Sequence, residues 1–184
     1  METTTILLIV VGLLVLWVIF AYNKLVSLTN HGKEAASDIE VQLKRRYDLI
    51  PNIINTVKGY ATHEASTLEK VISARNSAMS AQGADKVKAE GELAGMLKSV
   101  FALAESYPDL KANSNFVELQ RELSDTENKI QAARRFYNAN ARDLSIAIES
   151  FPTNFIAKSF GFTRLELFDL PDTDAAQQNI EVKF

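Results

Sequence analysis

The order of apolar and polar positions divides the chain into an apolar N-terminal segment and a more polar remainder. Residues 6–22 are apolar at every position except Gly12, and no charged residue occurs in residues 3–23. As a helix, residues 3–23 would be about 31 Å long, close to the ~30 Å thickness of a bilayer's hydrocarbon core. Leu, Ile, Val and Phe fill 13 positions of residues 6–20, which favours insertion by about 4–8 kcal/mol. The pattern predicts a transmembrane helix at residues 3–23.

Two other interpretations of this segment fit the sequence less well. A cleaved signal peptide would carry basic residues before the apolar stretch, whereas Glu2 is the charged residue there. The sequence Ile19-Phe20-Ala21-Tyr22 is also a poor small-x-small cleavage site. A buried helix of a soluble protein would need a larger body around it, because the segment is apolar on all faces. We therefore expect an uncleaved anchor.

The basic residues give a weak indication of orientation. Lys24 and Lys33 follow the span closely, the triplet Lys44-Arg45-Arg46 comes next, and no basic residue precedes the span. The positive-inside rule then favours a cytoplasmic body. This bias is small.

The remainder of the chain has the periodicity of long helices. One stretch alternates spacings of three and four, as in packed helices: Phe116, Leu119, Leu123, Thr126, Ile130, Ala133, Tyr137, Asn140, Leu144, Ala147 and Phe151. Asn115 with Glu118 resembles a capping box, and Pro152 would end the helix. We expect one helix of about 36 residues, roughly 54 Å long.

Weaker signals predict the other helices. Asp85 is a candidate N-cap for a helix to about Ser106, after Gly83 ends the preceding helix. Residues 107–114 would form the next loop, and Pro51 would kink or briefly break the helical structure, which would resume over residues 50–80. Short connections favour antiparallel neighbours.

The predicted fold class is therefore all-α. An N-terminal transmembrane helix would continue into an elongated antiparallel bundle of three to four long helices. The expected domains are the anchor at residues 1–23, the bundle at 24–151 and an irregular tail at 152–184.

The tail differs in composition from the bundle. Phe occurs at positions 155, 160, 162, 168 and 184, and residues 161–184 carry two basic and five acidic side chains, which account for the net charge of −3. Aromatic residues at this frequency are unusual for free disorder. We expect the tail to pack on its own bundle or on a neighbouring subunit.

Composition excludes several classes of chemistry. The sequence has no cysteine, so disulfides, thiolate metal sites and cysteine nucleophiles are absent. The net charge of −3 does not indicate a nucleic-acid partner. His63-Glu64 lacks the second histidine of a zinc motif, since position 67 is Thr, and His31 is the other histidine.

No catalytic, cofactor-binding or metal-ligating residue is predicted, and we expect no enzyme activity and no cofactor. The sequence lacks the Gly-x-Ser-x-Gly motif and a glycine-rich phosphate loop. Gly91 and Gly95 lie in a predicted helix flanked by charges, and their spacing favours close packing within the bundle.

The triplet Lys44-Arg45-Arg46 has two interpretations. It could contact anionic lipid, but an upright helix would place it about 30 Å from the membrane, beyond a Debye length. Intramolecular ion pairs with acids such as Glu40 and Asp48 are the favoured interpretation.

One long motif covers residues 37–52 and 56–64, from Ser37-Asp38-Ile39-Glu40 through Lys44-Arg45-Arg46-Tyr47-Asp48-Leu49-Ile50-Pro51-Asn52 to His63-Glu64. This motif resembles the signature of the LemA family, and the resemblance extends over nearly the whole chain. Further matches are Tyr22-Asn23, Leu25-Val26, Leu68-Glu69, Ala74-Arg75, Tyr107-Pro108-Asp109-Leu110-Lys111-Ala112-Asn113, Ala133-Arg134-Arg135, Tyr137-Asn138, Phe151-Pro152, Asn154 and Ile156-Ala157.

The resemblance implies a bacterial membrane protein with one N-terminal span and a helical soluble domain, and it carries over no catalytic residue. The motif from Lys44 to Asn52 could serve an interaction or only the structure of a kinked junction. Two functions remain open. One is a non-catalytic scaffold in the bacterial inner membrane that forms a homo-oligomer or docks another membrane protein. The other is an accessory or regulatory subunit of a membrane enzyme complex, for example in proteolytic quality control.

Overall fold

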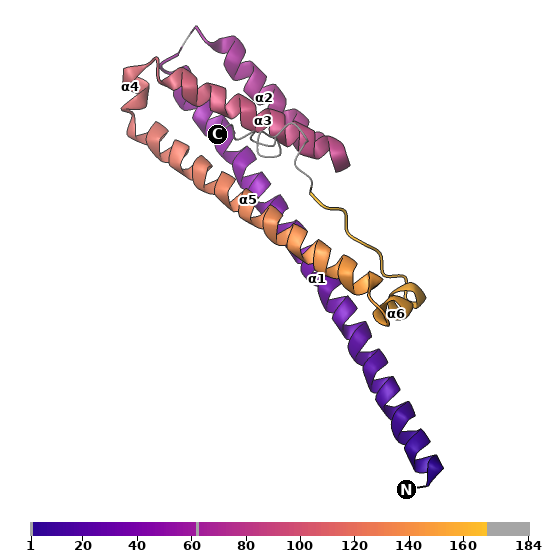
Figure 1. Cartoon of the computed structure of the whole chain (residues 1–184). Coiled ribbons are helices and arrows are strands. Elements are labelled where there is room, and N and C mark those ends of the chain that lie inside the picture. Colours follow the sequence, from indigo (N-terminus) through magenta and orange to yellow (C-terminus); the bar gives the residue numbers. More distant parts are fainter. Residues whose placement is uncertain (1, 62, 169–184) are drawn as a thin grey trace, which may run out of the picture. The chain divides into compact units, whose positions relative to one another are not determined.

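Helices make up the regular structure of the chain (Figure 1). The structure is a computed structural model, and it describes residues 2–61 and 63–168. The elements are α1 (Thr3–Lys58), α2 (Ala65–Ser80), α3 (Gly83–Ala104), α4 (Pro108–Lys111), α5 (Ser114–Glu149) and α6 (Thr153–Ser159). The described residues contain no strand. The predicted all-α class, with a long apolar N-terminal helix followed by further helices, is confirmed.

The short break predicted at Pro51 is wrong, whereas the alternative of a kink stays a prediction. Helix α1 continues through Pro51 and ends at Lys58, so no helix runs from residue 50 to residue 80. The helical structure is interrupted instead between Lys58, the end of α1, and Ala65, the start of α2. Just after Lys58, the amides of Gly59 and Tyr60 donate turn-type hydrogen bonds to the carbonyls of Thr56 and Val57.

The other helix ends differ from the prediction by a few residues. Asp85 lies in the first turn of α3 and is not its N-cap. Helix α5 has the expected 36 residues, but its cap is Asn113, whose Oδ1 accepts a hydrogen bond of 3.0 Å from the Phe116 amide. The short helix α4 occupies part of the predicted loop. These errors follow from choosing caps by residue type alone.

The described residues form two compact units. Among the described residues, unit 1 contains residues 2–39 and 132–167, and unit 2 contains residues 40–131 and Phe168. Helices α1 and α5 each contribute one part to each unit. The domain boundaries expected from the sequence stay a prediction.

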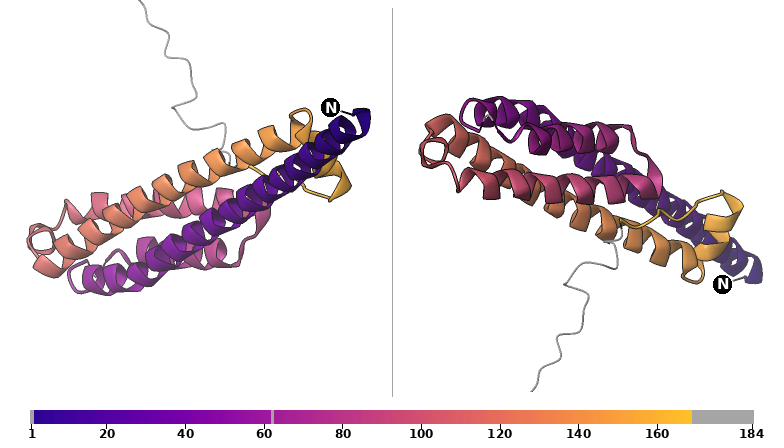
Figure 2. Two further views of the ribbon diagram at one scale, coloured as in Figure 1. Left: turned by 90° about the horizontal axis from the view of Figure 1, so that it is seen from below. Right: turned by 90° about the horizontal axis from the view of Figure 1, so that it is seen from above.

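Unit 1 has a small apolar core between α1, α5 and α6. Leu25, Leu144, Ala147 and Ala157 are buried together, and Leu28, Ile148, Ile156, Phe162 and Leu165 pack against them. This part of α5 runs antiparallel to α1 (Figure 2): Leu144 and Ala147 meet Leu25, whereas Tyr137, earlier in α5, contacts the segment that lies against Gly32. The C-terminal end of α5 therefore lies beside the end of the apolar stretch of α1.

Residues 160–167 pack on their own chain within unit 1. The rings of Phe160 and Phe162 meet the ring of Tyr22 edge-on, with centroids 4.8 and 5.7 Å apart. Leu165 lies so close to Gly32 that a Cβ at position 32 would collide with its Cδ1. The Tyr137 hydroxyl donates a hydrogen bond of 2.9 Å to the Glu166 carbonyl. The remaining tail, residues 169–184, lies outside the described residues.

The seam predicted along α5 is buried for most of its length. Eight of its eleven residues are buried, Leu119 and Ala133 are half-buried, and Phe151 is 80% exposed. The expectation that Phe151 is packed as part of the seam is therefore wrong. The reason is that α5 ends at Glu149, before Phe151, and that Pro152 follows.

Tyr137 provides a test of how the segment after α6 is held. Burial, together with the negative charge of Glu166, raises the pKa of Tyr137 above its ordinary value. Tyr137→Phe should lower the free energy of unfolding by about 1 kcal/mol at neutral pH, because one buried hydrogen bond is lost. The stabilisation is complete below the unfolded pKa of about 10 and is lost as pH rises through it towards the raised folded pKa.

Urea unfolding of both proteins in detergent, from about pH 8 to about pH 11, measures this difference. The gap between wild type and Tyr137→Phe should shrink above about pH 10. A gap that stays constant over the whole range would contradict the assignment.

Candidate functional site

Two helices of unit 2 each carry a charged residue on their apolar stripe. In α1 the buried positions Leu43, Ile50, Ile53 and Val57 are joined by Arg46, which is 1% exposed. In α3 the buried positions Leu93, Leu97 and Val100 are preceded at helical spacing by Glu90, which is 2% exposed. Because side chains three and four residues apart share one helix face, both charges point into the apolar interior of unit 2.

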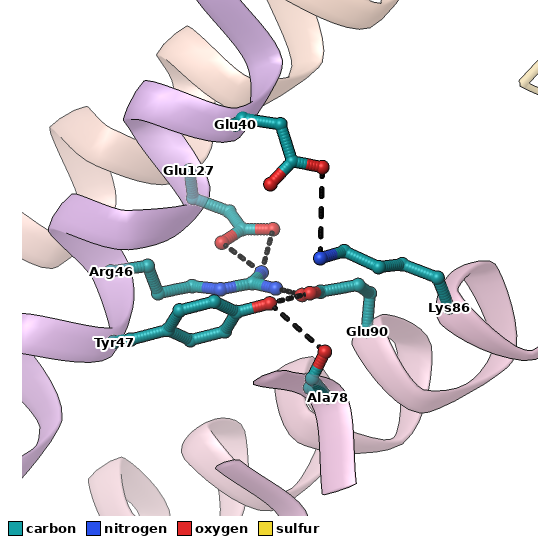
Figure 3. Close-up of polar contacts among 7 residues, drawn as sticks. All are labelled: Glu40, Arg46, Tyr47, Ala78, Lys86, Glu90 and Glu127. Atoms are coloured by element: carbon teal, nitrogen blue, oxygen red, sulfur yellow. Dashed lines mark hydrogen bonds and ion pairs between the residues drawn. The ribbon is translucent and has the colours of Figure 1, made fainter. Parts of the chain in front are cut away.

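Arg46 and Glu90 form a buried ion pair at the centre of a polar network (Figure 3). The guanidinium Nη2 faces the Glu90 carboxylate, and Nη1 donates to both oxygens of Glu127 from α5, at 3.0 and 3.3 Å. The Tyr47 hydroxyl donates to Glu90 and lies 3.3 Å from the Ala78 carbonyl of α2. The network, which we call the Arg46 network, thus joins α1, α2, α3 and α5 within unit 2.

An outer ion pair lies next to the Arg46 network. Lys86 Nζ on α3 lies 3.6 Å from Glu40 Oε1 on α1 (Figure 3). Glu40 is largely exposed, so this pair adds at most about 1 kcal/mol. The buried pair is different. Removing Arg46 would leave the buried Glu90 carboxylate without its cation, and removing Glu90 would leave the buried Arg46 with the partly exposed Glu127 alone. Either loss should cost about 3–5 kcal/mol.

Arg75 explains why α1 continues through Pro51. A proline has no amide hydrogen, so the carbonyl four residues earlier, that of Tyr47, has no helical donor. Arg75 Nε of α2 donates a hydrogen bond of 2.8 Å to this carbonyl oxygen. The α2 side chain therefore supplies the hydrogen bond that Pro51 removes.

The Arg46 network is arranged for helix pairing. The two carboxylates, Glu90 and Glu127, bracket the guanidinium of Arg46, so the charges of this network are directed at one another across three helices of unit 2. Among residues 2–61 and 63–168, no cluster of three or more His, Asp or Glu side chains could hold a metal ion. The sequence predicted no catalytic, cofactor or metal residue, and this stays a prediction.

The basic triplet forms intramolecular contacts. Lys44 pairs with Asp48 at 2.7 Å, as expected, but both side chains are largely exposed. Glu40 pairs with Lys86, not with the triplet. A hydrogen bond from Lys129, together with the charges of Lys129 and Arg45, lowers the pKa of Asp125 below its ordinary value.

The remaining sequence candidates lie on the surface. His31 and His63 are exposed. Gly91 and Gly95 are also exposed, and nothing lies within 4 Å of a Cβ placed on either. The predicted close packing at these glycines is wrong, because they lie on the face of α3 opposite the stripe that contains Leu93 and Leu97.

Sequence reasoning missed the acidic partners of Arg46. Neither Glu90 nor Glu127 is among the candidate residues that the sequence analysis names. The available signal was position: Glu90 precedes Leu93, Leu97 and Val100 at spacings of three and four. An acid on one apolar stripe and a base on another indicate a buried ion pair, because neither can be buried alone.

Comparison with known proteins identifies similar chains. The model of the LemA family matches residues 35–184. Magnetosome protein MamQ of Magnetospirillum gryphiswaldense is 24% identical over 174 residues, which cover 80% of this chain and 64% of that protein. Protein LemA of Metamycoplasma hominis is 28% identical over 155 residues, covering 83% of this chain and 70% of that protein. Magnetosome protein MamQ 2 of Paramagnetospirillum magneticum is 24% identical over 174 residues, covering 80% of this chain and 64% of that protein. The chain thus spans less than two thirds of the length of these MamQ proteins.

The Arg46 network predicts a specific pattern of stabilities. Glu90→Leu should lower the free energy of unfolding by about 3–5 kcal/mol, because the Arg46 charge stays buried with Glu127 alone. The double variant Arg46→Met/Glu90→Leu should regain most of this loss, since no charge is then buried. Denaturant unfolding of the full chain in detergent, followed by far-UV circular dichroism, measures both.

Lys44→Met in the same helix is the matched control, because it breaks an exposed ion pair. It should change the free energy of unfolding by less than about 1 kcal/mol. A Glu90→Leu variant as stable as the Lys44→Met variant would refute the assignment of Arg46 and Glu90 as a mutually dependent pair.

Proposed function

The chain belongs to the LemA family, and from this membership, its apolar helix and its ion-paired body we propose a non-catalytic membrane-anchored scaffold. In this proposal, residues 3–23 hold the protein in the bilayer. The helical body forms a homo-oligomer or docks another membrane protein.

The main support for a non-catalytic role is that the buried charged side chains pair with each other. Among the described residues, Arg46 and Glu90 are the fully buried charged side chains, and they pair with each other. Enzymes direct perturbed charged groups towards a substrate, whereas these two join helices of the same unit. The names of the relatives, MamQ and LemA, are not those of enzymes, which supports a non-catalytic role.

The N-terminal helix supports the anchor. Helix α1 is long and apolar enough to cross a membrane, and only 6% of its most apolar 18-residue window is buried by the rest of the chain. Exposed apolar surface of this extent is unfavourable in water by about 25 cal/mol per Å². A bilayer removes this cost, and residues 3–23 have the matching length.

Helix α2 offers a surface for self-association. Ile72 and Met79 are 38% and 49% exposed, and their seven-residue spacing places them on one face. Neighbouring exposed apolar side chains are typical of protein contact sites. We propose that this face contributes to the homo-oligomer.

Mass photometry after extraction in mild detergent tests the homo-oligomer. The wild type should give a mass larger than one chain, and Ile72→Glu/Met79→Glu should shift the distribution towards single chains. The control Ser66→Glu/Ser73→Glu places the same charges at exposed polar positions of α2 and should leave the mass unchanged.

Wild-type protein that is monomeric at every concentration would overturn the self-association proposal. Crosslinking before extraction separates the remaining possibilities. Self-crosslinks support the scaffold, whereas a stoichiometric enzyme partner would instead indicate an accessory subunit of a membrane complex.

We further propose that the anchor lies in the bacterial inner membrane with the body in the cytoplasm. Lys24 and Lys33 follow the span, and Lys158 lies on α6, which packs beside its end. An excess of basic residues near a span favours the cytoplasmic side.

Single cysteines can test this orientation, because the sequence contains none. Ser66→Cys, an exposed position of the body, should react with a membrane-impermeant maleimide only after spheroplasts are permeabilised. Glu2→Cys, before the span, should react in intact spheroplasts and serves as the matched control. Labelling of Ser66→Cys in intact spheroplasts would place the body outside.

A further inference from the structure

Three phenylalanine rings are exposed together around α6 in unit 1. Phe151, Phe155 and Phe160 are 80%, 63% and 59% exposed. The rings of Phe151 and Phe155 meet edge-on with centroids 6.0 Å apart. The three residues, which we call the aromatic patch, occupy a segment of ten residues that includes the whole of α6.

The aromatic patch lies level with the end of the apolar stretch of α1. The Phe160 ring contacts Tyr22, and Ala157 of α6 shares a buried core with Leu25. Ala147 also meets Leu25, and α5 runs antiparallel to α1. The Phe151 ring meets that of Phe155 on α6, the helix whose Ala157 packs on Leu25, so Phe151 also lies near the end of the apolar stretch.

The burial of one residue of α1, Ala21, is consistent with this position of the aromatic patch. Ala21 is buried, although it belongs to the proposed span. Protein therefore covers one side of the last turn of residues 3–23, while the aromatic patch stays uncovered beside it. If the span is inserted, the patch lies where the hydrocarbon core meets the lipid headgroups.

The charges around the aromatic patch suit lipid phosphates. Lys24 directly follows the span, Lys158 lies on α6, and both are exposed. Arg164 is paired with Glu149 at 3.0 Å, so these two charges offset each other. Lys24, at the end of the span, and Lys158, on α6, thus lie on the two segments that border the patch, and their charges attract anionic headgroups.

We propose that the aromatic patch is a second membrane contact, with Phe151, Phe155 and Phe160 inserted between the headgroups of an anionic bilayer. Aromatic rings with neighbouring lysines are typical of helices that lie in the membrane interface. The occupant is lipid because the patch is continuous with the proposed span at Tyr22. Two contacts, one spanning and one interfacial, restrict the rotation of unit 1 about the axis of α1. This inference rests on the anchor proposed above.

Tryptophan quenching by brominated lipids tests the proposal in the full chain. Trp17 is the only native tryptophan, so Trp17→Phe provides a silent background. In this background Phe155→Trp should lose about half or more of its fluorescence in vesicles of phosphatidylcholine and phosphatidylglycerol that carry shallow bromines.

Phe136→Trp in the same background is the matched control. Phe136 is 55% exposed, similar to Phe155, but lies about 20 Å further back along α5 than Phe151. It should keep its fluorescence. Equal quenching at both positions would overturn the proposal, because contact would then not be confined to the patch.

The remaining outcomes are distinguishable. If the Phe155→Trp variant is unquenched and emits as in water, the patch is uncovered, and if it is unquenched but blue-shifted, protein covers the patch. Both overturn the proposal. The wild-type protein reports the anchor separately, because an unquenched Trp17 would refute insertion of residues 3–23. A quenched Trp17 in the wild type, together with an unquenched Phe155→Trp variant, refutes only the interfacial contact.

The lysines are tested with the same readout. Quenching of the Phe155→Trp variant should be stronger in vesicles with phosphatidylglycerol than in pure phosphatidylcholine, and adding Lys24→Gln/Lys158→Gln should reduce this difference. The control is Lys98→Gln, at an exposed lysine of α3. It should leave the difference in quenching between the two kinds of vesicle unchanged. Quenching that does not depend on lipid charge would refute the role of the two lysines.

Discussion

The structure of unit 2 depends on a guanidinium and a carboxylate that are buried against each other. Arg46 of α1 and Glu90 of α3 would each be strongly destabilising alone in an apolar interior. Together they limit how α1 and α3 can be aligned, because a shift by one heptad would separate the charges and bury both unpaired. The apolar stripes alone do not impose this restriction, since leucine and valine positions repeat along both helices. Tyr47 and Glu127 satisfy further polar atoms and so extend the same constraint to α2 and α5.

The proline in the middle of α1 shows a second constraint imposed by tertiary contacts. Local propensity predicts a helix break at Pro51, and the carbonyl of Tyr47 does lose its helical donor there. Arg75 replaces that donor from another helix. Tyr47 thus contributes its hydroxyl to the Arg46 network and its carbonyl to α2, so one residue connects both constraints. The motif from Lys44 to Asn52 therefore contains two residues, Arg46 and Tyr47, whose hydrogen bonds and ion pairs described above lie within unit 2. Its Pro51 removes the helical donor that Arg75 replaces.

These residues also show what could be predicted from the sequence. The apolar segment and the seam of α5 follow from periodicity, because each depends on the chemistry of neighbouring positions along one helix. The continuity of α1 does not, because its donor Arg75 lies 28 positions from Tyr47. The second partner of Arg46, Glu127, could not be predicted either, since it lies 81 positions away. For the candidate site, the sequence indicates that a buried charge needs a partner, but the choice among many acids requires the arrangement of the helices.

Phe151 shows that hydrophobic periodicity alone does not predict burial within the protein. Its spacing continues the seam of α5 from Leu144 and Ala147, yet it is exposed while they are buried. Periodicity identifies side chains that avoid water, and it does not specify what replaces the water. Along a soluble bundle the replacement is always protein, so the seam predicts burial. Where a helix ends beside an apolar span, lipid is a second possible surrounding, and an apolar position can satisfy the pattern without a protein partner. The three rings around α6 can therefore belong to the same hydrophobic pattern as the core and still face outward, if the medium outside them is the bilayer.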